Sequence, residues 1–239
     1  MSLRVFVPPG VAAPGRELEL DEDESRYLLR VRRARAGATI ELLDGEGGSW
    51  VAELTQADRR ARVVVVRARE DEGPGAAART SAKILLLGMP DTAALLEAVT
   101  GAAELGATQI VFVRCERSQG RCPSRARLDR VLRATMRQCG RPSPPSLLGA
   151  SPQDAWSLSQ ALDHEAHLPG LFGALGVQPI DAAPELGVRL LVGPEGGLTD
   201  AEVDAAIAAG FVGVGLGPWT LRTPTAVVAL LARHASLRS

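Results

Sequence analysis

The spacing of apolar residues divides the chain into two parts with different periods. From residue 83 onward, continuous apolar runs such as 83–88 and 109–115 alternate with stretches of helical spacing, the first of them at 91–106. Continuous apolar runs of this length are typical of strands buried on both faces, and their alternation with helices indicates parallel pairing. We therefore expect an α/β domain over residues 83–239.

Further elements of this domain follow from the same spacing. Residues 124–139 predict a second helix, and residues 151–162 predict a third, which Ser151 would cap. A short strand and a loop are expected within 164–172, and a buried strand is expected at 188–192.

The first part of the chain has the period of two that is typical of strands. Residues 3–7 alternate, residues 38–54 predict a hairpin around two glycine-containing turns, and residues 61–68 predict a valine-rich strand. Turn signals at this spacing predict a small β-barrel, which we place at residues 1–72. Gly, Pro and Ala dominate residues 73–82, which we interpret as the linker.

A glycine-rich turn, residues 193–197, follows the predicted strand at 188–192. Thr199 then begins a helix, with Glu202 three residues later as the second half of a capping box. Glycine lets the backbone approach a ligand closely, and the first amides of a helix point outward unpaired. The pattern predicts a ligand site at this turn, and a plain strand-to-helix connection is the alternative.

A second stretch, residues 213–234, repeats the order of apolar strand, Gly-Pro turn and helix. Together the two stretches resemble the carboxy-terminal signature of the SPOUT methyltransferases. More closely, they resemble the family that methylates N3 of a uridine in small-subunit ribosomal RNA. In the family's active segment the matching residues are Leu221, Arg222, Thr223, Thr225 and Ala226. Trp219 replaces an arginine there, and Pro224 replaces a glutamate.

The resemblance implies S-adenosyl-L-methionine bound among three loops, at 167–172, 193–197 and 216–225. The residues implied to bind it are Leu168, Gly193, Pro194, Glu195, Gly196, Gly197, Leu216, Gly217, Leu221, Arg222, Thr225 and Ala226. It also implies a SPOUT fold with a trefoil knot, and a homodimer with its sites at the subunit interface. Arg222 is the expected catalytic group. Glu195 is the nearest acid in the motifs, either as a second catalytic group or as a carboxylate that satisfies helix-terminal amides.

The front module resembles the PUA-like domain of the same family, with Asp44 and Gly45 of the hairpin among the matches. The module contains a basic run, and Arg30, Arg32 and Arg33 are its candidate RNA contacts. Small barrels of this kind often present basic edges to RNA, and a solvated helix face is the alternative. The acidic stretch before the basic run, residues 17–24, is expected to be solvated.

The strongest charge signal lies in residues 114–141, where nine arginines stand against two acidic residues and the net charge is +7. Like charges at helical spacing repel one another, and a polyanionic partner offsets that cost. We therefore expect contacts with ribosomal RNA or the small ribosomal subunit, against the alternative of a solvated face. The candidate contacts are Arg117, Arg130, Arg133, Arg137 and Arg141.

The chain departs from the family pattern at several positions. Tyr27 stands where the family has a histidine, Gly101 replaces a lysine and Arg137 replaces a glutamate, besides Trp219 and Pro224. These departures keep two alternatives to uridine methylation open. One is an RNA-binding protein of this fold with weak or lost methyl transfer, and the other is a methyltransferase that acts on a different RNA nucleotide.

Composition argues against several other classes of protein. Hydrophobic residues make up 46% of the 239 residues, yet no apolar run reaches the ~18 residues of a membrane helix. The N-terminus lacks the apolar core of a signal peptide, so we expect a cytoplasmic protein. Cys115, Cys122 and Cys139 lack CxxC spacing, and His164 and His167 have no third ligand, so no metal site is expected. Neither a GxxxxGK[ST] loop nor a GxSxG elbow occurs, which argues against nucleoside triphosphatases and α/β-hydrolases.

Overall fold

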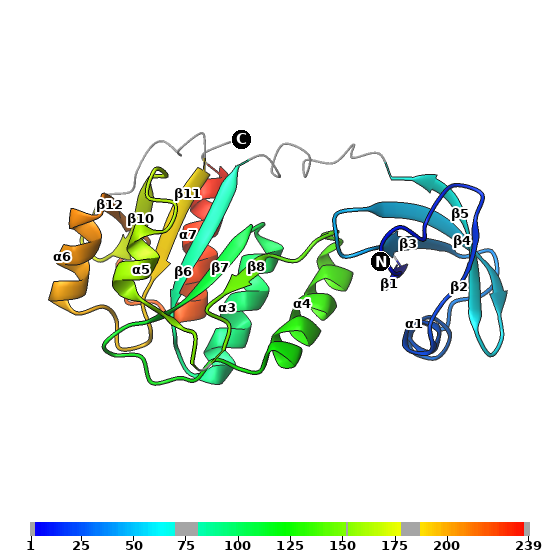
Figure 1. Ribbon diagram of the computed structural model, residues 1–239, viewed down its shortest axis with the longest axis horizontal. Helices are drawn as coiled ribbons and strands as arrows, with labels where there is room; N and C mark the ends of the chain where they lie inside the picture. The colour runs from blue at the N-terminus through cyan, green and yellow to red at the C-terminus, as the bar shows by residue number, and fades with distance from the viewer. Residues whose placement is uncertain (1–2, 70–80, 152, 178–186, 237–239) are drawn as a thin grey trace. The chain divides into compact units, whose positions relative to one another are not determined.

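The structure, a computed structural model, describes residues 3–69, 81–151, 153–177 and 187–236 (Figure 1). The chain forms two compact units. The first unit comprises Met1–Ala76 together with Met136–Pro144, and the second comprises Ala77–Thr135 together with Pro145–Ser239. Each unit has its own sheet and its own hydrophobic core.

The first unit is built on one five-stranded sheet in the order β1-β3-β4-β5-β2. The strands are β1 (Leu3–Phe6), β2 (Glu17–Glu19), β3 (Thr39–Leu43), β4 (Ser49–Ala57) and β5 (Ala61–Ala68). β1 pairs in parallel with β3, and the other pairings are antiparallel. The predicted hairpin is confirmed: the Asp44 carboxylate accepts hydrogen bonds from the amides of Glu46 and Gly48 and closes the turn between β3 and β4.

One face of this sheet holds the core of the first unit. Leu42 of β3 and Val63 of β5 are fully buried in it. The short helix α1 (Glu22–Arg26) continues into a π-helical turn, η1 (Tyr27–Val31), and Leu28 of that turn fills the same core. Part of the predicted basic run is therefore tied to the core through its apolar members.

The second unit is a parallel sheet in the order β12-β10-β11-β6-β7-β8, with β9 pairing to β7 off that path. The strands are β6 (Ala82–Gly88), β7 (Gln109–Arg114), β8 (Ser146–Leu148), β9 (Trp156–Ser157), β10 (Gly170–Ala174), β11 (Gly187–Val192) and β12 (Phe211–Gly215). All their pairings are parallel, so the predicted α/β class is confirmed.

Helices cover both faces of this sheet (Figure 1). They are α3 (Thr92–Glu104), α4 (Arg125–Cys139), α5 (Leu158–Asp163), α6 (Asp200–Ala208) and α7 (Thr223–Ser236). Leu87 and Leu190 point to the face covered by α3, α4 and α7, whereas their neighbours Leu86 and Leu191 point to the face covered by α5 and α6. This double burial explains why the strands read as continuous apolar runs.

The helices α3 and α7 pack closely at Gly101. A Cβ atom at that position would lie 2.6 Å from Cγ2 of Val228 on α7. Gly101 is also the position at which the family pattern has a lysine. The glycine therefore fits a tight contact between the two helices that a larger residue would force apart.

The third helix predicted from the sequence begins later than expected. Residues 151–162 were expected to be helical, but α5 starts at Leu158, and the residues before it form β9. The hydroxyl of Ser151 bonds locally to the Asp154 carboxylate instead of capping a helix. Ser157 is the true N-cap, and it forms a complete capping box with Gln160.

Residues 136–144 pack with the first unit, although the sequence placed them in the second domain. Met136 packs against Phe6 and Leu43, on the face of the sheet opposite the main core. Arg4 of β1 donates to the carbonyl oxygen of Gln138 at 2.7 Å. Most of the expected linker, residues 73–80, lies outside the described residues, so the boundaries at 72 and 83 stay predictions.

Candidate active site

A cavity of about 520 Å³ lies at the carboxyl ends of the neighbouring strands β10, β11 and β12. Its walls come from residues 172–175, residues 191–194 and the loop that follows β12, including Leu216 and Trp219. In α/β sheets, ligands bind at the carboxyl ends of the parallel strands. A cavity of this volume is in the range of small-molecule sites.

The cavity brings together the two glycine turns that the sequence singled out. Seven of the twelve predicted cofactor residues line it: Gly193, Pro194, Gly197, Leu216, Gly217, Leu221 and Ala226. Gly197 and Gly217 have φ angles of 71° and 134°, in the region that favours glycine. Any other residue at these two positions would strain the turns, which explains the glycine pattern without reference to the ligand.

Three other predicted cofactor residues lie next to the cavity rather than in its wall. Leu168 is buried in the core beneath β10, in the same cluster as Phe172. Arg222 is exposed between the lining residues Leu221 and Thr223, and Thr225 is exposed in the first turn of α7, next to the lining residue Ala226. Both sequence neighbours of Arg222 thus line the cavity, and its catalytic role stays a prediction.

The last two, Glu195 and Gly196, form the outer edge of the turn, where loops from two other strands hold it. Oε1 of Glu195 accepts from the amide of Asp91, at 3.2 Å. Asp91 is itself the N-cap of α3. Arg117 donates from Nη1 to the carbonyl oxygens of Gly196, at 2.9 Å, and Leu198, at 3.4 Å. Glu195 is thus the acceptor for a helix-terminal amide, and Arg117, which was expected only as an RNA contact, binds the turn itself.

The predicted capping box at the start of α6 is confirmed. The Thr199 side chain accepts from the amide of Glu202, whose carboxylate accepts from the amide of Thr199. The second oxygen of Glu202 accepts from the amide of Glu116, at 2.8 Å, and so ties the loop after β7 to the same place. On the other side, the Thr223 hydroxyl donates to the carbonyl oxygen of Gly193, at 3.1 Å. The start of α7 is therefore bonded to a loop that forms the cavity, and the start of α6 is bonded to the loop after β7.

A buried arginine supports this region, and the sequence analysis missed it. Arg189 on β11 is only 1% exposed. It donates to the carbonyl oxygens of Leu168, at 2.9 Å, Leu162, at 2.5 Å, and Ala209, at 3.4 Å, and its guanidinium stacks on Phe211 with 4.6 Å to the ring centroid. Burial lowers the pKa of Arg189, and the charge of Asp163 opposes that shift. The sequence signal that could have revealed this role is a single charged residue within the apolar run 188–192.

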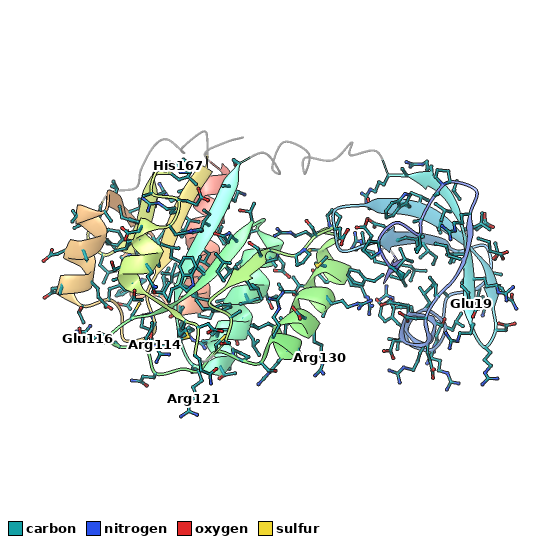
Figure 2. The ribbon with its side chains drawn as sticks, in the orientation of Figure 1. Glu19, Arg114, Glu116, Arg121, Arg130 and His167 are labelled. Carbon is teal, nitrogen blue, oxygen red and sulfur yellow. The ribbon has the colours of Figure 1, made fainter. Side chains whose placement is uncertain are left out.

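The candidate RNA contacts of the second unit differ in what they do. Arg130 and Arg133 are exposed on α4, as an RNA-binding role requires. Figure 2 shows the Arg121 and Arg130 side chains directed outward from the second unit. Arg117 is exposed as well, but one of its nitrogens is bonded to the glycine turn.

In the first unit, Arg30 and Arg33 are exposed, and Arg32 is half-buried. Arg33 has a φ of 54°, an uncommon conformation for a residue other than glycine. Arg141 is half-buried, and burial lowers its pKa. The exposed arginines of η1 and the following turn remain the better placed candidates for RNA in this unit.

Arg137 is engaged within the first unit. Its Nη2 is 2.5 Å from Oε1 of Glu24, whose side chain is buried, so the expectation that the whole acidic stretch is solvated is wrong at that residue. The guanidinium also lies over the ring of Tyr27, with 4.2 Å to its centroid, and farther from that of Phe6. Tyr27 and Arg137 are two of the departures from the family pattern. The two replacements lie against each other and form a cation–π contact.

The cysteines give no sign of a reactive thiolate. Burial, with a smaller contribution from Glu202, raises the pKa of Cys115 to about 12, and burial raises that of Cys122 to about 11. Both thiols are therefore protonated at neutral pH, whereas Cys139 is exposed. Among the described residues, no group of three potential metal ligands converges, and no helix is long and apolar enough to cross a membrane.

Comparison with known proteins gives the class to which this fold and cavity belong. The profile of an RNA methyltransferase domain matches residues 79–235, and that of an RNA methyltransferase PUA domain matches residues 20–66. The second unit is therefore an RNA methyltransferase domain, and the module before it is a PUA domain.

Individual relatives narrow the class. Ribosomal RNA small subunit methyltransferase E of Synechocystis is 30% identical over 246 aligned positions, which cover 95% of this chain and 77% of the relative. The enzyme of the same name from Mycobacterium tuberculosis is 29% identical, with 92% and 86% covered. A crystal structure of that enzyme from Neisseria gonorrhoeae, bound to S-adenosyl methionine, has a TM-score of 0.84 at 26% identity, with 99% of this chain and 98% of that chain covered. The chain belongs to the ribosomal RNA small subunit methyltransferase E family.

Proposed function

We propose that this protein binds S-adenosyl-L-methionine in the cavity and methylates N3 of a uridine in 16S ribosomal RNA. We further propose that it works as a homodimer in the cytoplasm and that its second unit has the trefoil knot of SPOUT enzymes. The observation that carries the proposal is that the two glycine turns of the family signature form one cavity. The Neisseria relative, which is bound to S-adenosyl methionine, supports the choice of cofactor.

The residues around the cavity fit this cofactor. Val192, Leu216 and Leu221 give apolar walls suited to a purine ring, and Gly193 leaves its backbone open beside them. Asp200 also lines the cavity and is exposed, so its carboxylate is available to hydroxyl or ammonium groups. When bound, S-adenosyl-L-methionine supplies a methyl group carried on a positively charged sulfur.

One of the chain's own residues addresses the charge that develops on the base. The proton on N3 of uracil passes to water, which leaves negative charge on the ring until the methyl group is transferred from sulfur to N3, and a fixed cation nearby stabilises that charge. Arg222 is exposed directly after the lining residue Leu221, and on its other side the Thr223 hydroxyl is bonded to the turn. Arg222 is the group proposed to stabilise the uracil anion. Glu195, which holds the amide of Asp91, is given a structural role.

The direct test is methyl transfer to small ribosomal subunits that lack the modification, followed by mass-spectrometric mapping of nucleosides. We expect 3-methyluridine to appear at a single position. Arg222→Ala should lower turnover by about 30- to 1000-fold, the scale for one preorganised donor, with unchanged melting temperature and affinity for the demethylated cofactor. Arg59→Ala, an exposed arginine in the first unit, is the matched control. Wild-type turnover by Arg222→Ala would remove Arg222 from the mechanism.

The basic face of α4 is proposed to bind RNA phosphates. Reversing both Arg130 and Arg133 to glutamate should weaken RNA binding and reduce the slope of log affinity against log salt by about two. Reversing Arg59 and Arg60, which are exposed in the turn between β4 and β5, changes the total charge equally and is the control. Equal losses in both double variants would mean that only the overall charge matters.

A second candidate function is RNA binding with weak or lost methyl transfer. Two features favour it: Pro224 stands in place of the family's glutamate at the buried start of α7, and Trp219 stands in place of an arginine. A protein that binds both the cofactor and the ribosomal subunit, but produces no methylated nucleoside, would support this candidate. A methylated nucleoside other than 3-methyluridine would support a different target nucleotide.

The homodimer is proposed from the family resemblance, and α7 offers a surface for it. A groove of about 540 Å³ runs along α3 and the start of α7, lined by Leu96, Pro224, Thr225 and Val228 among others. Val228 is 41% exposed there. Sedimentation equilibrium should give twice the mass of the chain, and Val228→Glu should shift that equilibrium toward the single chain.

A further inference from the structure

Trp219 is the most exposed of the large apolar side chains that the structure describes, at 77%. It also lines the cavity, from the loop that follows β12. Large aromatic side chains are usually buried, because their apolar surface is costly in water. An exposed indole at the mouth of a ligand cavity therefore suggests a partner that supplies the missing contact.

The loop that holds Trp219 is anchored on both sides. Before it, Leu216 packs against the main core of the second unit. After it, the Thr223 hydroxyl donates to the carbonyl oxygen of Gly193. Because both ends of the loop are fixed, the indole is held at the rim of the cavity.

The chemistry of the partner follows from the place of the indole. Leu175, which is 59% exposed, lines the same cavity from the loop after β10, so apolar surface comes from two loops. A base must approach this opening to reach a methyl donor bound inside. Flat bases are held in such sites by stacking on aromatic and apolar side chains, a contact worth roughly 5- to 150-fold in affinity per base.

The family pattern supports the same choice. At this position it has an arginine, which offers both a plane for stacking and a charge for phosphate. An indole keeps the plane and gives up the charge. The replacement is therefore compatible with stacking on a base and not with an ion pair to a phosphate.

We propose that Trp219 stacks on the uracil base that is to be methylated as the base enters the cavity. The inference rests on the proposed function, because it takes the cavity as the site of the methyl donor. It adds the residue that holds the substrate, and it separates base recognition by Trp219 from phosphate binding by the arginines of α4.

The first test uses the fluorescence of Trp219 itself. The chain has three tryptophans, so the double variant Trp50→Phe, Trp156→Phe leaves Trp219 as the single emitter. Oligouridylate, added to protein saturated with demethylated cofactor, should quench the emission in a saturable way. Quenching by the demethylated cofactor alone, with no further change on adding RNA, would assign the indole to the cofactor. A change on concentrating the protein without RNA would assign it to a second copy. Either result would overturn the proposal.

The second test compares side chains at position 219 and two ligands. Trp219→Leu should weaken the binding of oligouridylate by at least about fivefold, and Trp219→Phe should stay within about threefold of the wild type. Neither should change the binding of an abasic oligomer with the same backbone, the affinity for the demethylated cofactor, or the melting temperature. Trp219→Arg adds a cation that can pair with a phosphate and should steepen the salt slope by about one.

The outcomes separate the inference from the function on which it rests. If Trp219→Leu binds oligouridylate as the wild type does, the stacking role is wrong while the methyltransferase assignment stands. If the wild type binds oligouridylate no better than the abasic oligomer, base recognition at Trp219 is likewise excluded. If the wild type binds neither the cofactor nor RNA, both the inference and the proposed function fail.

Discussion

Replacing Arg189 by methionine should destabilise the methyltransferase domain and loosen the strand β10 that leads into the cavity. Methionine keeps the apolar stem but removes every donor. The carbonyl oxygens of Leu162 and Leu168 lose short bonds of 2.5 and 2.9 Å to a cation, and that of Ala209 loses a longer one. Bonds to charged groups contribute about 1.5–3 kcal/mol each. Relief of the buried charge offsets part of the loss, as the lowered pKa of Arg189 indicates, so we expect a net cost of about 3 kcal/mol.

For a unit of this size, that cost corresponds to a fall in melting temperature of roughly 6–12 °C. Differential scanning calorimetry measures the fall, and isothermal calorimetry measures the accompanying loss of affinity for the demethylated cofactor. Arg130→Met, an exposed arginine on α4, is the control and should change the melting temperature by no more than about 1 °C. A fall of less than about 2 °C in Arg189→Met would refute the reasoning, because the three carbonyl oxygens would then have found other partners at little cost.

Three further predictions concern the surroundings of the cavity and the thiols. Gly88→Ala should weaken cofactor binding, because its Cβ would lie 2.8 Å from Cδ of Pro194 and 2.9 Å from Sγ of Cys115; calorimetry with the demethylated cofactor checks this, and wild-type affinity would contradict it. A maleimide at pH 7.5 should modify Cys139 alone in the folded protein and all three thiols after unfolding, as mass spectrometry would show. Finally, the raised pKa values of Cys115 and Cys122, about 12 and about 11 against an ordinary 9.0, mean that the folded state holds these protons more tightly. The contribution of these two thiols to the free energy of unfolding should therefore be fully present below pH 9 and should be lost as the pH rises from 9 toward 11 and 12. Urea unfolding across that range would measure the loss.

The sequence predicted the features that depend on neighbours along the chain. The apolar runs became the strands of the parallel sheet, and the Thr199–Glu202 capping box formed as expected because its members are three residues apart. The two glycine turns were recognised for the same reason. Their meeting in one cavity could be expected only from the family resemblance, because β11 and β12 both lie beside β10, a relation that spacing does not fix.

Features that depend on distant partners could not be predicted. Arg189 donates to the carbonyl oxygens of Leu168 and Ala209, which lie 21 residues before it and 20 residues after it in the sequence. A charged residue in a strand does not reveal which acceptors it will bond. Glu24 and Arg137 lie 113 positions apart, so each was read as part of a local charge cluster rather than as a pair. Arg117 was read by its charge alone, although the structure also gives it a bond to the turn at Gly196.

Residues 136–144 belong to the first unit although they follow part of the second unit in the sequence, and this order limits how the protein can fold during synthesis. Synthesis proceeds from the N-terminus, and a continuous domain can fold as soon as it has left the ribosome. Here the strands β1 to β5 emerge early, but Met136 and Arg137, which pack against Phe6 and pair with Glu24, emerge only after β6, α3 and β7. The ion pair between Glu24 and Arg137 cannot form before that point. The amino-terminal PUA domain is therefore completed only once residues 77–135 of the methyltransferase domain have been translated.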